Sequence, residues 1–257
     1  MKERACIRVA LLAGEIMLRS GAETYRVEDT INRILKAQNL EVVESFVTPT
    51  GLFITVDDPS IEMMTLVKRV QNRTTHLEKV ALVNDLSRRF VAGQLSNAQA
   101  LEELEMIQSK SFYETHIKVL SIGLAAAFFT IVFGGGWKDF IASGLIGSLW
   151  AWSQFYLESK KVSNFFIDLV GGAFIALLAI LLTDFIPLGQ NLDPIIIGSI
   201  MPLVPGVAIT NAIRDTIQGD LVSGNSRTSE ALLIAVSIAA GVGVVLKIYL
   251  LLIGGSI

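Results

Sequence analysis

Few residues in this sequence could support redox, metal or nucleotide chemistry. Cys6 is the single cysteine, so no internal disulfide can form. His76 and His116 are the two histidines, and neither has other ligand residues at a metal-binding spacing. The sequence also lacks a Walker-type glycine loop and any recognisable arrangement of nucleophile, acid and base. We therefore expect no metal, no cofactor, no catalytic residue and no ATP-driven transport by this chain alone.

Charged residues are unevenly distributed along the chain. The formal net charge is −3 and no basic patch stands out, so no nucleic-acid partner is expected. Residues 118–257 hold only 7 of the 21 Lys and Arg and 8 of the 24 Asp and Glu. Hydrophobic residues make up 52% of the whole chain, above the usual range of about 45–50% for soluble domains. The sequence thus predicts a cytosolic domain at 1–117 and a membrane domain at 118–257.

The pattern of residues 1–117 predicts an α+β domain. Apolar residues recur at helical spacing near both ends of this region. Between them lie three β-like runs, of which the first two are separated by Thr48-Pro49-Thr50-Gly51, a hairpin signal. The expected helices are 3–20, 23–38, 76–92 and 97–108, and the expected strands are 41–47, 52–56 and 61–70.

Five apolar runs in residues 118–257 are each long enough to cross a bilayer. A spanning helix needs about 17–25 mostly apolar residues, and helices satisfy their own backbone groups in lipid. The runs are 119–135, 140–157, 165–186, 195–213 and 231–253. The predicted fold class is an α-helical membrane protein with five transmembrane helices, preceded by the α+β cytosolic N-terminal domain.

Lys and Arg residues near the ends of these runs predict the orientation. With residue 117 in the cytosol, Lys138 and Lys247 fall toward the outside, and the loop 185–193 has no Lys or Arg. The residues that then flank cytosolic ends are Lys110, Lys118, Lys160, Lys161, Arg214 and Arg227. No signal peptide is recognisable at the N-terminus. We expect a multi-pass protein of the bacterial cytoplasmic (inner) membrane, with its N-terminus in the cytosol and its C-terminus outside.

The fourth apolar run contains the residues most suggestive of transport. Pro202, Pro205 and Gly206 lie in its middle, and prolines remove backbone donors and clash with preceding carbonyls. A break at this depth exposes backbone groups and half-helix dipoles, which transporters use to bind substrate. The alternative is a packing kink that a neighbouring helix fills.

Polar residues follow the break directly. Asn211, Arg214 and Asp215 share one helical face, with Thr210 beside them, and the polar run continues through Asp220 to Glu230. These residues are candidates for the permeation path or its gate, although they could also be solvated residues at a membrane interface. Asp168, about one turn inside the third run, is a further candidate. It could instead be interfacial and paired with Lys160 or Lys161.

Several stretches resemble the threonine/serine exporter family. In the N-terminal region these are AGEIMLRSGAETYRVE at 13–28 and FVTPTG at 46–51. In the membrane region they are PGVAITNAIRD at 205–215, GDLVSG at 219–224 and EAL at 230–232. The resemblance implies a secondary exporter, driven by the proton motive force, for serine and threonine or for a dicarboxylate such as succinate. The chain also resembles the split form of the family. This resemblance implies a second, shorter membrane subunit as partner.

Other functions and assemblies stay open at this point. A membrane-anchored sensor or regulatory subunit could bind a ligand through residues 1–117, and a membrane-embedded hydrolase is a weaker possibility. A homo-oligomer could cover the broken helix in place of a separate subunit. The break with its polar residues favours the exporter, because a simple anchor has no need of it. The expected partners are thus a small-molecule substrate, the lipid bilayer and another membrane subunit.

Overall fold

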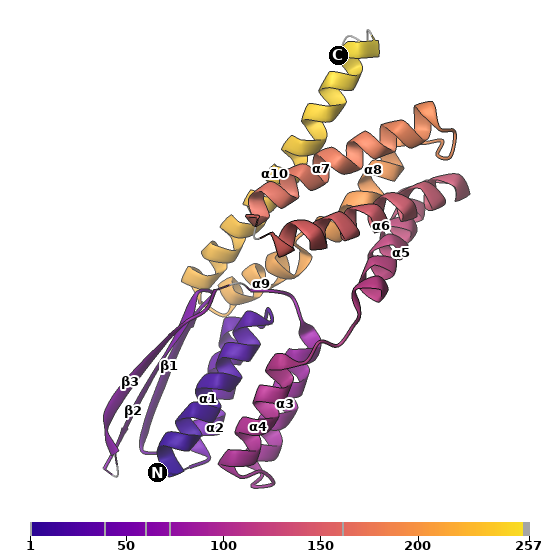
Figure 1. Cartoon of the computed structure of the whole chain (residues 1–257). Coiled ribbons are helices and arrows are strands. Elements are labelled where there is room, and N and C mark those ends of the chain that lie inside the picture. The colour runs from indigo at the N-terminus through magenta and orange to yellow at the C-terminus, as the bar shows by residue number, and fades with distance from the viewer. Residues whose placement is uncertain (1, 39, 60, 72, 161, 254–257) are drawn as a thin grey trace. The chain divides into compact units, whose positions relative to one another are not determined.

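The computed structural model of the chain describes residues 2–38, 40–59, 61–71, 73–160 and 162–253 (Figure 1). The chain forms two compact units. The first contains the residues up to Lys110 together with Gly206–Glu230, and the second contains Ser111–Pro205 together with the residues from Ala231 onward. Each unit therefore combines segments that lie far apart in the sequence.

The N-terminal part of the first unit has the expected α+β composition. Its elements are α1 (Lys2–Arg19), α2 (Thr24–Lys36), β1 (Val42–Thr48), β2 (Gly51–Asp58), β3 (Ile61–Arg69), α3 (Leu77–Val91) and α4 (Asn97–Ser109). They are arranged in layers: the sheet lies against α1 and α2, and α3 and α4 lie on the other side of these helices (Figure 1). The expected helices and strands are all present, with ends that differ by a few residues.

The sheet is an antiparallel meander in the order β1-β2-β3. Thr48 pairs with Gly51, so the first hairpin closes through Pro49 and Thr50, where the sequence predicted a turn. Successive side chains of a strand point to opposite faces of a sheet. On β2 the inner face is buried, whereas Phe53 on the other face is exposed. One face of the sheet therefore belongs to the core and the other does not.

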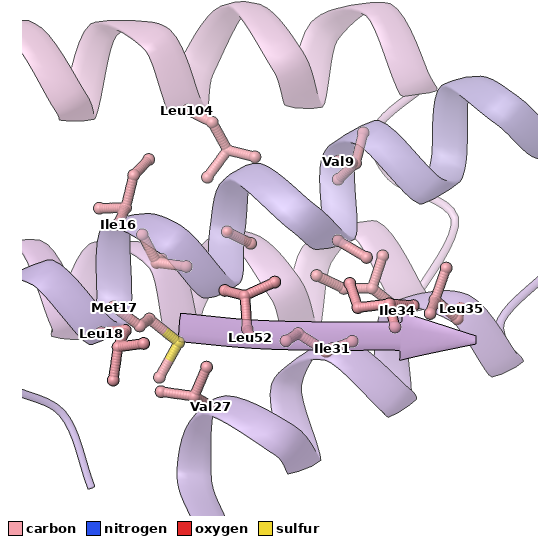
Figure 2. Packing of buried hydrophobic residues seen from close by; sticks show 14 of the residues in the cluster. Val9, Ile16, Met17, Leu18, Val27, Ile31, Ile34, Leu35, Leu52 and Leu104 are labelled. Atoms are coloured by element: carbon pink, nitrogen blue, oxygen red, sulfur yellow. The ribbon is translucent and has the colours of Figure 1, made fainter. Parts of the chain in front are cut away.

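Apolar side chains from α1, α2, β2 and α4 interdigitate in the core of this unit (Figure 2). Ile31, Ile34 and Leu35 recur at helical spacing along α2 and are fully buried, as their periodicity predicts. Cys6 lies in the same core, and burial raises the pKa of its thiol to about 12. Because the thiolate is the reactive form, Cys6 is chemically inert at neutral pH.

The second unit is helical. It contains α5 (Thr115–Val132), α6 (Trp137–Ser159), α7 (Asn164–Ile180) with a π-helical turn (Leu181–Phe185), α8 (Leu192–Ile200) with a 3-10 turn (Met201–Leu203), and the later part of α10 (Leu221–Ile253). The indole of Trp150 on α6 is buried and packs against Phe174 on α7, with 5.7 Å between ring centroids. α9 (Gly206–Ile217) belongs to the first unit.

Three helices of the described residues are long and apolar enough to cross a membrane. They are α5, α7 with its π-helical turn, and α10; the bent pair formed by α8 and α9 gives a fourth if it counts as one span. α6 covers the second predicted run with 23 residues. It does not qualify as apolar enough, because its serines, tryptophans, Gln154 and Tyr156 lower its mean hydropathy. The helices agree with a membrane protein, and the count of five spans stays a prediction.

Asp139 connects two loops of the second unit through hydrogen bonds. Its carboxylate is fully buried and accepts hydrogen bonds from the backbone N–H groups of Gly136, Gln190 and Asn191 and from the side-chain amide of Asn191, at 2.6–3.0 Å. Buried carboxylates need such partners. The loop between α5 and α6 and the loop between α7 and α8 therefore lie at the same end of this unit.

The compact units do not follow a single boundary near residue 117. That boundary was predicted as the point of entry into the membrane, and it stays a prediction. The contact pattern, however, assigns Gly206–Glu230 to the same unit as the α+β elements. The reason is a set of polar contacts to the turn between α1 and α2.

Candidate functional site at the junction of α1 and α2

The chain turns sharply between α1 and α2 at Gly21. Its φ of +87° lies in the left-handed region that glycine adopts without strain. The N–H of Gly21 donates to the carbonyl of Leu18, and the N–H of Ala22 donates to the carbonyl of Met17. This pattern is a Schellman C-cap, which satisfies carbonyls at the end of α1. It explains why Ser20-Gly21 interrupts the helical pattern of the sequence.

A second turn of the same type separates α9 from α10. Gly219 has a φ of +89°, and the N–H groups of Gly219 and Asp220 donate to the carbonyls of Thr216 and Asp215. The carboxylate of Asp220 then accepts from the N–H of Ser223 at 3.0 Å and so caps the first turn of α10. Both turns are thus Schellman C-caps with a glycine at positive φ. They also contact each other.

Two side chains bind the carbonyl oxygens of the first turn. The amide of Asn211 on α9 donates to the carbonyl of Gly21 at 2.8 Å. The guanidinium of Arg227 on α10 donates to the carbonyl of Ala22, also at 2.8 Å. About 190 residues of sequence separate the partners in the first bond. α9 and α10 are therefore attached to the backbone that links α1 and α2.

Two carboxylates bind the first residue of α2. Asp215 accepts a hydrogen bond from the N–H of Thr24 at 3.3 Å, and Asp220 accepts one from its hydroxyl at 2.9 Å. The first N–H groups of a helix lack partners within it, and the helix dipole favours negative charge at this end. Asp215 therefore supplies a backbone acceptor that α2 itself does not provide, since Glu23 makes no side-chain cap, and Asp220 binds the Thr24 side chain.

Arg227 and Asp215 form a buried ion pair. The Nε of Arg227 lies 2.9 Å from a carboxylate oxygen of Asp215, and the side chains are 5% and 0% exposed. Buried charges are tolerated when they are paired and hydrogen-bonded. Here the Arg227 guanidinium also binds Ala22 and the Asp215 carboxylate also binds Thr24. The pair thus joins α9, α10 and the first turn at one point.

Arg214 forms a more exposed ion pair with Glu23. Burial favours the neutral form of the Glu23 carboxyl, but hydrogen bonds from its own backbone and from Arg214 and Arg26 outweigh this effect and hold its pKa below the usual value. Glu23 is therefore ionised at neutral pH. A further ion pair, between Arg73 and Glu230 at 2.8 Å, connects the segment after β3 to α10.

We call Asn211, Arg214, Asp215, Asp220 and Arg227 with residues 21–24 the junction cluster. Asn211, Arg214 and Asp215 share one face of α9, as the sequence predicted, and that face contacts the α1–α2 turn. Residues 21–24 were not predicted as site residues, and Arg227 was included only as part of the polar run from Asp220 to Glu230. A signal for both was present, because residues 21–24 lie in the stretch 13–28 and Arg227 follows the stretch 219–224, both of which resemble the exporter family.

The remaining predicted residues lie elsewhere. Pro202 and Pro205 flank Val204, whose extended backbone (φ −62°, ψ 129°) separates the 3-10 turn from α9. The break predicted from the prolines is therefore present. Gly206 begins α9, and the exposed side chain of Thr210 donates to the Gly206 carbonyl at 2.9 Å.

Asp168 is half-buried on α7. Among the described residues it forms no ion pair, including with Lys160; Lys161 lies outside them. The Lys160 ammonium instead lies 5.6 Å from the centroid of the Tyr156 ring. The part of the chain that the structure describes also contains no group of three His, Cys, Asp or Glu side chains suited to a metal ion.

Comparisons with known proteins point to one family. The profile of the ThrE threonine/serine exporter family matches residues 8–249, a range that includes both turns of the junction cluster. Solved structures offer no significant match.

Three relatives illustrate the similarity. The threonine/serine exporter of Corynebacterium glutamicum is 26% identical over 92% of this chain and 50% of its own length. A "probable threonine/serine exporter" of Mycobacterium tuberculosis is 23% identical over 95% of this chain and 46% of its own. A "probable succinate transporter subunit YjjP" of Escherichia coli is 23% identical over 96% of both. The chain thus spans about half the length of the first two relatives and nearly all of the third.

Proposed function

Because the chain belongs to the threonine/serine exporter family, we propose that it is one subunit of a secondary exporter that moves small polar metabolites out of the cytosol. The family match carries this proposal. It extends over the α+β elements as well as the apolar helices, so both parts belong to one functional unit. This argues against the runner-up, a sensor domain on a membrane anchor, in which the helices would be mere scaffold.

The proposed substrates are serine and threonine, or a dicarboxylate such as succinate. The names of the relatives support both classes, since the longer relatives are named for the amino acids and the relative of similar length for succinate. All are small, polar and charged at neutral pH. The proposed driving force is the proton motive force, as the resemblance to the exporter family implies.

We propose that the protein crosses the cytoplasmic membrane of a bacterium five times. The five spans are α5, α6, α7, the broken pair of α8 and α9, and α10. The N-terminus then lies in the cytosol and the C-terminus outside. α10 has 33 residues, about 50 Å at 1.5 Å per residue, whereas the hydrocarbon core is about 30 Å thick. The part from Ala231 onward is therefore long enough to span it.

In this proposal the junction cluster is the gate rather than the substrate site. Most of its polar groups are already bonded to the α1–α2 turn, so they are not free to bind a metabolite. α9 follows directly after the break at Pro202 and Pro205. Movement of the α+β elements would therefore pull on the segment that carries the break. Pro202, Pro205, Gly206 and Thr210 then remain candidates for the path itself.

Ser199 is an additional candidate for the path. It lies on α8 shortly before Pro202, the residue is 1% exposed, and its hydroxyl has no hydrogen-bond partner among the residues that the structure describes. Buried polar groups are nearly always paired, so an unpaired hydroxyl next to a helix break fits a role in substrate binding. Asp168 on α7 is retained as a second intramembrane candidate.

The proposed partner is a second, shorter membrane subunit. The support is similarity over nearly the full length to a protein named as a transporter subunit. The test is efflux of threonine, serine and succinate from cells that lack both proteins, after return of this chain, the partner or both. Efflux only with both, and its loss on adding a protonophore, is the expected result. Full efflux with this chain alone contradicts the two-subunit proposal, and no efflux of any substrate contradicts the exporter.

A further inference from the structure

The outer face of the β1–β2–β3 sheet is unusually apolar for a surface in contact with water. An antiparallel sheet with one face on the core normally has polar residues on the other. Here Phe46, Phe53, Met63 and Val67 point outward and are 53%, 40%, 65% and 64% exposed. None of them contributes to the core on the inner face. The surface therefore has the composition of a contact face.

The aromatic and aliphatic side chains form one row across the sheet. Phe46 on β1 pairs with Phe53 on β2, and Phe53 pairs with Val67 on β3. The two phenyl rings have centroids 6.1 Å apart, which confirms that they share a face. The next row contains Thr55 and Thr65, whose hydroxyls are 3.0 Å apart.

Two opposite charges flank the apolar row at diagonal corners. Glu44 lies on β1 in the row of Thr55, and Arg69 lies on β3 in the row of Gly51. Phe53 therefore lies midway between them. Both charged side chains are exposed, and neither forms an ion pair within the described residues. The charges of Glu44 and Arg69 are thus self-complementary about Phe53.

We infer that this face binds the same face of a second copy of the chain, around a two-fold axis through Phe53. An axis in the plane between two facing sheets, perpendicular to the line from Glu44 to Arg69, places each Arg69 opposite the partner copy's glutamate. Strand spacings of about 4.8 Å and about 3.3 Å per residue make the strands of the two sheets cross at roughly 70°. This angle is nearer to orthogonal sheet packing than to aligned packing, in which strands stay within about 30° of each other. Phe53 then packs against its counterpart at the centre.

A weak interface of this kind suits proteins held in one membrane. The face covers on the order of 300 Å² from its strand and residue spacings, less than the roughly 800 Å² per partner of a stable soluble complex. Confinement to the same bilayer raises the effective concentration of the two copies. An anionic lipid surface is a poorer occupant, because membrane-binding faces are rich in Lys and Arg. This face carries Glu44 and Asp57 beside Arg69.

Cross-linking tests the axis. In native membranes, Phe53→Cys should form dimers with a short bifunctional maleimide, since Cys6 is buried and unreactive. Val91→Cys on α3 is the matched control, because Val91 is 41% exposed and Phe53 is 40% exposed. Equal cross-linking of both variants, or none at Phe53→Cys with normal abundance, overturns the proposal. The second outcome is what a covering bilayer or a different partner would give.

Charge exchange tests the pairing without a cysteine. Two differently tagged copies of the full chain are co-expressed and one tag is isolated. Arg69→Glu in both copies should lower recovery of the second tag several-fold, as should Glu44→Arg in both, because each places like charges opposite each other. A copy with Arg69→Glu and a copy with Glu44→Arg should pair as the unaltered chains do. Arg88→Glu on α3 should change nothing. Failure of the two variants to pair with each other, or full self-pairing of either, overturns the proposal.

Discussion

Arg227 and Asp215 form an ion pair of 2.9 Å in which both side chains are almost fully buried. The pair closes the polar contacts between the α9–α10 turn and the α1–α2 turn, since each partner also binds the backbone of the latter. Two sequence stretches nearly 200 residues apart therefore make one site. This arrangement gives the α1–α2 turn and the α9–α10 turn one shared role. Apolar helices that only anchor a protein in a membrane would not need these contacts.

The buried pair predicts strong energetic coupling. Arg227→Met leaves the Asp215 carboxylate buried without its countercharge, and breaking such a pair costs about 3–5 kcal/mol. Asp215→Asn should be destabilising for the same reason. The double variant should lose much less than the sum of the two, because no unpaired charge remains. Thermal unfolding of the purified chain in detergent measures the three values. Simple additivity would contradict the pairing.

Arg214 allows function to be separated from stability. It pairs with Glu23, as does Arg26, but only the Arg214 contact links α9 to α2. The two arginine side chains are 56% and 39% exposed, and each variant leaves Glu23 paired with the other arginine, so both Arg214→Ala and Arg26→Ala should accumulate normally in the membrane. We expect Arg214→Ala to reduce efflux and Arg26→Ala to leave it near normal. Normal efflux with Arg214→Ala would show that this contact is not part of the gate.

Local sequence patterns predicted the elements well, because those patterns report local conformation. The helical stripe of α2 and the turn at Pro49 were both visible in the sequence. Pro202 and Pro205 also predicted the break, since the missing N–H groups and ring clashes act within one turn.

The partners of the polar residues could not be predicted in the same way. Nothing in the residues around Asn211 indicates that it binds the carbonyl of Gly21, because that contact depends on the tertiary arrangement. The fourth apolar run was also drawn through to residue 213. The isoleucines at 209 and 213 extend the apolar pattern, yet they lie on the exposed face of α9, opposite its polar contacts. Composition alone therefore did not show that this half of the broken span is amphipathic.

Glu28 predicts a pH dependence of stability. Burial raises the pKa of the Glu28 carboxyl above its usual value near 4.5, and the nearby Asp220 and Asp215 carboxylates raise it further. The hydrogen bond that the Glu28 carboxyl accepts from the Val47 N–H lowers the pKa, but by less. A carboxyl with a raised pKa binds more protons in the folded state, so it makes the fold less stable as pH rises from about 4.5 through the folded pKa. Glu28→Gln keeps an acceptor for Val47 and cannot ionise.

The expected result is that Glu28→Gln unfolds at a higher temperature than the unaltered chain at pH 7, and that the difference shrinks toward pH 4. Thermal unfolding of both proteins in detergent across this range measures it. A difference that stays constant with pH, or that grows as pH falls, would contradict the raised pKa.

The Asp139 contacts predict that two loops lie on the same side of the membrane. Asp139 at the start of α6 binds the backbone of Gln190 and Asn191, so loops 133–136 and 186–191 cannot face opposite sides. In the proposed orientation, which rests on the distribution of Lys and Arg, both loops lie outside. Lys138→Cys and Gln190→Cys, both at exposed side chains, should therefore react with an impermeant maleimide in intact spheroplasts. Ser159→Cys, at the other end of α6, should react only after permeabilisation. Protection of the first two with labelling of the third would invert the orientation, and opposite results for the first two would contradict the Asp139 contacts themselves.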